Sequence, residues 1–200
     1  MIKQRLIQNL CMSAACVWMA GAVLAQDRNP RPEIVIPKLA SPPTIDGVLA
    51  EGEWERATAL TGFIAPTGPL SGVMVPYESK IYLAHDETHF YLALRCALPP
   101  GVKPSMKYRK RDEPVYMDSY QFELWLTPPV RGQLAAYQTI GNAYGAIYDV
   151  KQVPELGAVT TGWNANWTFK NSYKQGEYWT AELSVPFADF GEATVNPEEF

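Results

Sequence analysis

The chain has 200 residues, of which 47% are hydrophobic and 19% charged, so it is long enough for one packed domain and is not of the disordered class. Its formal net charge of −4 argues against a nucleic-acid-binding surface. Aromatic residues reach 12%, and 14 glycines and 17 prolines favour many short strands and turns over long helices.

Residues 1–25 are predicted to be a secretory signal peptide. Lys3 and Arg5 precede an apolar stretch, and small residues at the cleavage-specifying positions lead up to Ala25. The alternative is a membrane anchor, but the apolar stretch is short for a span of about 20 residues. Cleavage would leave 15 basic and 21 acidic residues, a net charge of −6. We therefore expect a secreted, periplasmic or cell-surface protein without a stable membrane span, in which Cys96 is an unpaired, buried small residue.

The segment after the signal peptide begins with a leader, residues 26–42, and then enters the domain. Asp46-Gly47 signals a turn. Glu53–Ala59 is predicted to form one or two helical turns that bury Trp54 in the core.

A β-hairpin is predicted where two alternating runs flank a short connection. The runs are Lys80–Ala84 and His89–Cys96. His85 and His89 lie at the two ends of the connection, which leaves a metal site open as an interpretation, although no third ligand converges on them.

The long connection from Leu98 to Tyr116 contains a basic run, Lys107–Arg111, followed by Asp112-Glu113. One interpretation is a solvated loop whose ion pairs contribute little. The other is that an arginine in this loop donates to the hydroxyl groups of a ligand or steadies a carboxylate.

The stretch Asp118–Pro128, DSYQFELWLTP, alternates apolar and polar residues like a strand that buries one face. Its other face carries Glu123 beside Trp125, and the ring of Tyr116 precedes it. Nothing in it indicates an activated nucleophile. These residue types suit a flat, hydroxylated ligand, because a ring covers an apolar face and a carboxylate accepts from hydroxyl groups.

Several further short strands are predicted, and they decide the fold class. They are Gln133–Ile140, Gly145–Val150, Trp163–Tyr173 and Tyr178–Val185, followed by a turn or short helix at Phe187–Phe190. Many closely spaced strands with little helix predict an all-β fold, an antiparallel β-sandwich of the immunoglobulin-like or jelly-roll-like type.

Four segments, PTIDGVLAEGEWERA, KIYLAHDETHFYLALRC, MDSYQFEL and WTAELSVPF, occur in this order and resemble the family 9 carbohydrate-binding modules. Those modules are β-sandwiches related to the DOMON-like fold and are attached to secreted glycoside hydrolases such as xylanases. The resemblance covers roughly residues 43–200. Family members continue through two more strands after the last segment, so the chain is expected to be a fragment that lacks them.

The resemblance implies a carbohydrate site. In sugar-binding members, a tryptophan before an Asp-Ser pair stacks on a sugar and a glutamate in the following strand accepts from its hydroxyl groups. In this chain Asp118-Ser119 matches the pair, Tyr116 is the nearest preceding ring, and Glu123 is the glutamate, two residues later than in the family. Gln138 takes the place of a basic residue on the next strand. The other rings that could cover a sugar are Trp125, Trp163 and Trp167, and the last two are interpreted equally well as packing between the sheets.

The function implied is carbohydrate binding in polysaccharide catabolism, with any O-glycosyl hydrolase activity in a covalently linked domain downstream. No catalytic constellation is visible, because Asp118 and Glu123 would face opposite sides of a regular strand. No cofactor is required by this interpretation, and a structural calcium ion is compatible with the family, with ligands unknown. Two alternatives stay open: a sandwich without ligand that serves as a spacer or docking module, and a haem-binding domain that uses methionine and histidine.

Overall fold

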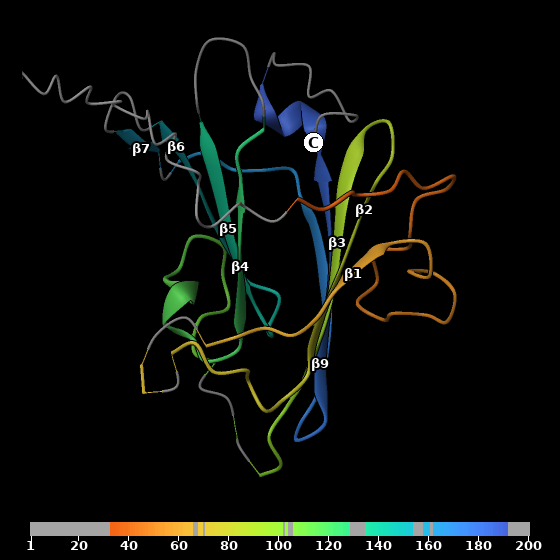
Figure 1. Ribbon diagram of the computed structural model, residues 1–200. Helices are drawn as coiled ribbons and strands as arrows, with labels where there is room; N and C mark the ends of the chain where they lie inside the picture. The colour runs from red at the N-terminus through yellow and green to blue at the C-terminus, as the bar shows by residue number, and fades with distance from the viewer. Residues whose placement is uncertain are drawn as a thin grey trace, which may run out of the picture. The chain divides into compact units, whose positions relative to one another are not determined.

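Two antiparallel β-sheets make up the domain (Figure 1). The computed structural model describes residues 33–65, 68–69, 71–101, 103, 106–128, 135–153, 158–160 and 162–191. Both sheets belong to the unit from Ile34 to Phe200. The predicted signal peptide, the first half of the leader and the predicted C-terminal truncation lie outside the described residues.

The larger sheet has five strands in the order β1-β2-β3-β9-β8. Their bounds are β1 Thr58–Leu60, β2 Ser79–His85, β3 His89–Ala97, β8 Thr168–Lys174 and β9 Tyr178–Pro186. The predicted hairpin is confirmed as β2 and β3, and the last predicted pair of strands as β8 and β9. β3 and β9 lie side by side in the middle, so the beginning and the end of the domain meet in one sheet.

The smaller sheet has four strands in the order β4-β5-β6-β7. Their bounds are β4 Gln121–Leu126, β5 Ala136–Asn142, β6 Ile147–Val153 and β7 Ala158–Thr160. The alternating stretch Asp118–Pro128 contains β4, which forms an edge of this sheet. Two 3-10 helices complete the described elements, η1 at Val115–Met117 and η3 at Phe187–Phe190.

The core lies between the two sheets and follows from the alternation of each strand. On the larger sheet Leu92 faces Leu183 across β3 and β9, and both are buried. From the smaller sheet Phe122 of β4 packs edge-to-face against Phe169 of β8, with 5.6 Å between ring centroids. Burying each such side chain contributes about 1.5–3 kcal/mol. The predicted sandwich is confirmed.

Two sequence-based boundaries were wrong for physical reasons. Residues 51–56 form consecutive turns rather than a helix, and β1 begins at Thr58, inside the predicted helical segment. β8 begins at Thr168, five residues after the predicted start, because residues 163–167 cross from one sheet to the other. Aromatic and polar residues alternate in this segment as they do in a strand, but the segment pairs with no other strand among the described residues.

The outer face of the larger sheet is covered by the chain from Lys38 to Ala57. Lys38 forms a parallel bridge with His85, so this part of the predicted leader belongs to the fold. Trp54 is buried against Ala84, Tyr91 and Ala93, which confirms its predicted place in a core. The segment PTIDGVLAEGEW, residues 43–54, therefore covers the outer face of the larger sheet.

Candidate functional site

The outer face of the smaller sheet gathers most of the predicted site residues. Glu123 and Trp125 are two apart on β4 and share this face. Gln138 of β5 is directly opposite Trp125, and Ile140 is directly opposite Glu123. Tyr148 of β6 extends the row of Glu123 and Ile140. The face is therefore polar and aromatic around a small apolar centre.

Glu123 links the polar residues of this face. Its Oε1 atom accepts from the indole Nε1 of Trp125 at 2.6 Å and from Nε2 of Gln138 at 2.6 Å. The indole is 46% exposed. Because both donors hold one carboxylate oxygen, the three side chains are fixed relative to each other before any ligand arrives.

Tyr116 lies on η1, beside this face. Its ring packs edge-to-face on Tyr148, with 5.3 Å between centroids, and is 49% exposed. The neighbouring Val115 is fully buried and packs against Ile140, which holds η1 on the sheet. Gln121 of β4 donates to the carbonyl oxygen of Tyr116 at 3.0 Å. The structure thus brings Tyr116 to the same face as Glu123 and Gln138.

Asp118, the acidic member of the Asp-Ser pair, is buried and forms hydrogen bonds with the loop that precedes η1. Its carboxylate accepts from the backbone N–H groups of Lys107 at 2.8 Å and Tyr108 at 3.3 Å. It also accepts from Nδ2 of Asn142 at 2.7 Å, and that amide group donates to the carbonyl oxygen of Tyr108 at 2.8 Å. Asp118 is therefore an anchor for the loop rather than a ligand group.

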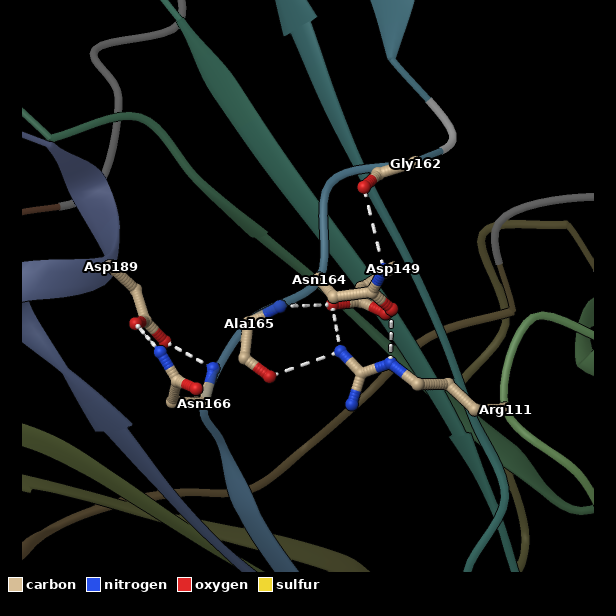
Figure 2. A network of polar contacts seen from close by, with 7 residues as sticks. All are labelled: Arg111, Asp149, Gly162, Asn164, Ala165, Asn166 and Asp189. Atoms are coloured by element: carbon tan, nitrogen blue, oxygen red, sulfur yellow. Dashed lines mark hydrogen bonds and ion pairs between the residues drawn. The ribbon is translucent and has the colours of Figure 1, made fainter.

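A second buried carboxylate, Asp149 of β6, is the centre of a polar network that joins Arg111 to Ala165 (Figure 2). Its Oδ2 atom accepts from the guanidinium of Arg111 at 2.5 Å and from the N–H of Ala165 at 2.7 Å. Arg111 also donates to the carbonyl oxygen of Ala165 at 3.0 Å and to Asn164 at 2.6 Å. Burial raises the pKa of Asp149, partly offset by the Ala165 N–H and by Arg111. The predicted alternative that an arginine of this loop steadies a carboxylate is thus observed.

Two predicted sugar platforms do not join the face of Glu123. Trp167 is only 8% exposed and belongs to the core between the sheets. Trp163 packs on Tyr137 at 4.9 Å and on Trp167 at 5.9 Å between centroids. In the structure both rings pack against other rings, as the packing interpretation expects. Figure 2 shows that the segment carrying them is tied down through Ala165 and Asn166.

The remaining candidates offer weaker sites. A cavity of about 670 Å³ lies against β1 and β2 and is lined in part by Trp54, Lys80 and Tyr82, but the Trp54 indole is buried and bonded to Glu182. The ring of His85 contacts the carbonyl oxygen of Asp86, and the ring of His89 contacts the hydroxyl of Thr88. Among the described residues no group of three or more His, Cys, Asp and Glu side chains is placed to hold a metal ion.

Two further sequence predictions have a structural outcome. Cys96 is half-buried against the core, and burial raises the pKa of its thiol although Ser79 acts in the opposite direction. Within the residues that the structure covers, no helix is long and apolar enough to cross a membrane.

Comparison with known proteins identifies the fold. No model of a protein family matches the chain, and no curated protein matches it in sequence. Among solved structures, a candidate carbohydrate-binding protein from Bacteroides uniformis matches with a TM-score of 0.53 and 13% identity over 70% of this chain. The match spans 65% of that protein, less than two thirds of its length.

A second solved structure is a family 9 carbohydrate-binding module from Caldicellulosiruptor kristjanssonii in complex with glucose. It matches with a TM-score of 0.51 and 13% identity over 80% of this chain and 71% of that one. At this identity the match shows the fold alone. The resemblance to family 9 modules, expected from the sequence, is confirmed at the level of the fold.

Sequence reasoning missed two features of the site. Gln121 shares the outer face, and its position two residues before Glu123 could have placed it there. The pairing of Arg111 with Asp149 joins residues 38 apart, and no local pattern marks it. The loop from Met106 to Asp118 is therefore held more firmly than its composition indicated.

Proposed function

We propose that this domain binds carbohydrate on the outer face of the four-stranded sheet. The observation that carries the proposal is the exposed indole of Trp125, whose Nε1 donates to Glu123 two residues back on the same strand. This hydrogen bond fixes the position of the indole, and Trp125 stays 46% exposed. The C–H face of a sugar ring packs on such a surface.

The hydroxyl rim of the sugar would be bound by the polar residues around the ring. Within the described part of the chain, the two donors to Glu123 both reach Oε1, which leaves Oε2 to accept from a ligand hydroxyl group. Hydrogen bonds to a charged acceptor are the stronger ones, and they stabilise binding by about 1.5–3 kcal/mol each. Tyr116 offers a second ring beside them.

The name of one structural neighbour supports the ligand class, since that family 9 module was solved with glucose. We further propose that the domain is exported and serves a glycoside hydrolase domain of a longer protein in polysaccharide breakdown. The sequence of residues 1–25 and the resemblance to family 9 modules support this. No cofactor takes part in binding of this kind, and a calcium ion would have only a structural role.

Isothermal titration calorimetry with glucose, cello-oligosaccharides and xylo-oligosaccharides tests the proposal. Trp125→Ala and Tyr116→Ala should each weaken binding about 2- to 10-fold, the range of an aromatic contact. Glu123→Ala should weaken it about 10- to 100-fold, the range of a charged hydrogen bond. Tyr77→Ala is the matched control, because Tyr77 is 42% exposed but lies outside this face.

Two results would contradict the proposal. Binding that survives both Trp125→Ala and Glu123→Ala would place the site elsewhere on the domain. A folded wild-type protein that binds none of these sugars would favour the alternative of a spacer or docking module.

A further inference from the structure

The loop before η1 carries four basic side chains in a chain whose formal net charge is −4, and the acidic Asp112 and Glu113 follow them directly. Lys107, Arg109 and Lys110 are all exposed. Among the described residues, none of these three side chains takes part in an ion pair. The fourth basic residue of the run, Arg111, is already committed to Asp149. Three cationic groups are thus available to a ligand.

The carboxylates of Glu113 and Asp118 accept hydrogen bonds from backbone N–H groups of this loop and not from its cationic side chains. Glu113 accepts from the N–H groups of Arg109 at 2.8 Å and Lys110 at 3.0 Å. Asp118 accepts from the N–H of Lys107 at 2.8 Å. The loop is therefore held in one conformation by its own acidic residues, which lowers the entropy lost on binding.

Arg109 is oriented by stacking. Its Cζ atom lies 3.9 Å from the ring centroid of Tyr144, a residue of the β5–β6 turn that is 43% exposed. A guanidinium group that stacks on a ring keeps its N–H edge available, and that edge matches the two oxygens of a carboxylate or sulfate group. The pair of Arg109 and Tyr144 thus has the form of an oxyanion site.

This basic loop lies at one end of the proposed sugar face. Asn142, the last residue of β5, donates to the carbonyl oxygen of Tyr108 in the loop. Gln138, opposite Trp125, is four residues earlier on the same strand, a separation of about 13 Å at about 3.3 Å per residue. A ligand that reaches both ends must be longer than one sugar unit.

The charges along this surface select the class of ligand. At one end Glu123 repels an anion, and at the other Arg109, Lys107 and Lys110 attract one. A polymer with an anion on every unit, such as a nucleic acid, would bring a charge against Glu123. We infer that the surface takes an acidic saccharide, a sugar chain with neutral units at Trp125 and a carboxylate or sulfate group at Arg109. This inference rests on the proposed function and names its ligand more closely.

The test compares a xylo-oligosaccharide that carries one glucuronic acid with the unsubstituted oligosaccharide of the same length. Calorimetry on the full chain should give about 5- to 10-fold tighter binding of the acidic form, from one bidentate contact and weaker exposed ones. The advantage should shrink between about 50 and about 500 mM salt. Arg109→Gln and Lys110→Gln should reduce it without changing affinity for the neutral form, while Lys174→Gln, at the exposed last residue of β8, should not.

The inference is overturned if neither the uronate nor a sulfated oligosaccharide of the same length binds more tightly than the neutral form, or if the advantage survives in the Arg109→Gln/Lys110→Gln double variant. Equal or tighter binding of a single-stranded oligonucleotide would identify a general polyanion surface and also overturn it. A sulfated oligosaccharide that gains affinity where the uronate does not would support the inference with sulfate as the anionic group.

The same titrations distinguish a failure of the proposed sugar face from a failure of the proposed anion site. If the acidic form binds but Trp125→Ala has no effect on it, the sugar face is wrong while the anion site stands. If the neutral form binds through Trp125 and the acidic form gains nothing, the sugar face stands alone. If neither form binds, both are overturned.

Discussion

Trp54 donates its indole N–H to the buried carboxylate of Glu182 at 2.9 Å, across 128 positions of the sequence. The second oxygen of the same carboxylate accepts from the backbone N–H groups of Asp46 at 3.0 Å and Gly47 at 2.7 Å. One side chain of β9 therefore binds both ends of the segment IDGVLAEGEW. This explains why that segment needs its turn and its tryptophan.

Removing the indole N–H of Trp54 should lower the free energy of unfolding by more than the smaller buried area of the new side chain accounts for. Trp54→Phe leaves Oε1 of Glu182 without its donor, which we expect to cost about 2 kcal/mol of the free energy of unfolding beyond the change in packing. Urea denaturation measures it. Trp179→Phe is the control, because Trp179 is equally buried but its Nε1 has no hydrogen-bond partner in the described part of the chain. Equal losses in the two variants would show that the hydrogen bond contributes nothing.

The stability contributed by Glu182 should rise as the pH falls. Burial raises the pKa of Glu182, against the opposing effect of its three donors. The folded state therefore takes up a proton at a higher pH than the unfolded state, whose pKa is near the ordinary 4.5, and this stabilises the folded state as pH falls through the raised pKa. The free energy of unfolding of the wild type minus that of Glu182→Gln should increase from about pH 7 to about pH 4.5. A difference that decreases over this range would show that the donors dominate.

Two glycines with the same backbone conformation provide a matched pair. Gly47 has φ of +89° and Gly52 has φ of +81°. A Cβ atom on Gly47 would lie 2.7 Å from the backbone of Asn171, whereas one on Gly52 would meet nothing within 4 Å. We expect Gly52→Ala to cost about 1–2 kcal/mol for the left-handed backbone alone and Gly47→Ala at least about 2 kcal/mol more. Thermal denaturation of both variants checks this, and equal melting temperatures would refute the close approach.

The ion pair of Arg111 and Asp149 should contribute both to the free energy of unfolding and to the local stability of the loop, residues 106–118. Arg111→Ala leaves a buried carboxylate with a single N–H donor, and we expect a loss of about 2 kcal/mol. This is below the range for a fully buried pair, because the guanidinium is partly exposed to water.

The double variant Arg111→Ala/Asp149→Asn serves as the control for this pair. It should recover part of the stability, since the uncompensated charge is gone. Hydrogen exchange should show faster opening of residues 106–118 in Arg111→Ala. Unchanged exchange there would show that Asp118 alone holds the loop.

Local patterns predicted the strands well. The two runs in KIYLAHDETHFYLALRC predicted the hairpin of β2 and β3, and the alternation of QFELWL placed Glu123 and Trp125 on one exposed face. The prediction for β4 rests on the period of two that a half-buried strand shows. β3 is buried on both faces, and its apolar run beside a short connection predicted it. Trp54, the tryptophan that the sequence assigns to the core, is buried.

What could not be predicted depends on contacts between distant residues. Trp163 and Trp167 were left open between platform and packing, and only the position of Tyr137, on another strand, decides for packing. Asp118 looks like a polar surface residue in the sequence, but its carboxylate is buried by Asn142 from β5. Which strand becomes an edge, as β4 does, depends on the pairing of the whole sheet.

The position of β9 in the middle of the larger sheet sets the order in which this chain can fold. β2 and β3 form an early hairpin, but β3 must wait for β9, which pairs with it across about ninety residues. Residues 43–54, which cover the outer face, depend on the same strand, because Asp46 and Trp54 donate hydrogen bonds to Glu182 of β9. Pairing at such long range is slow to form, on the order of milliseconds to seconds. The larger sheet is therefore complete only after almost all of the domain has been synthesised.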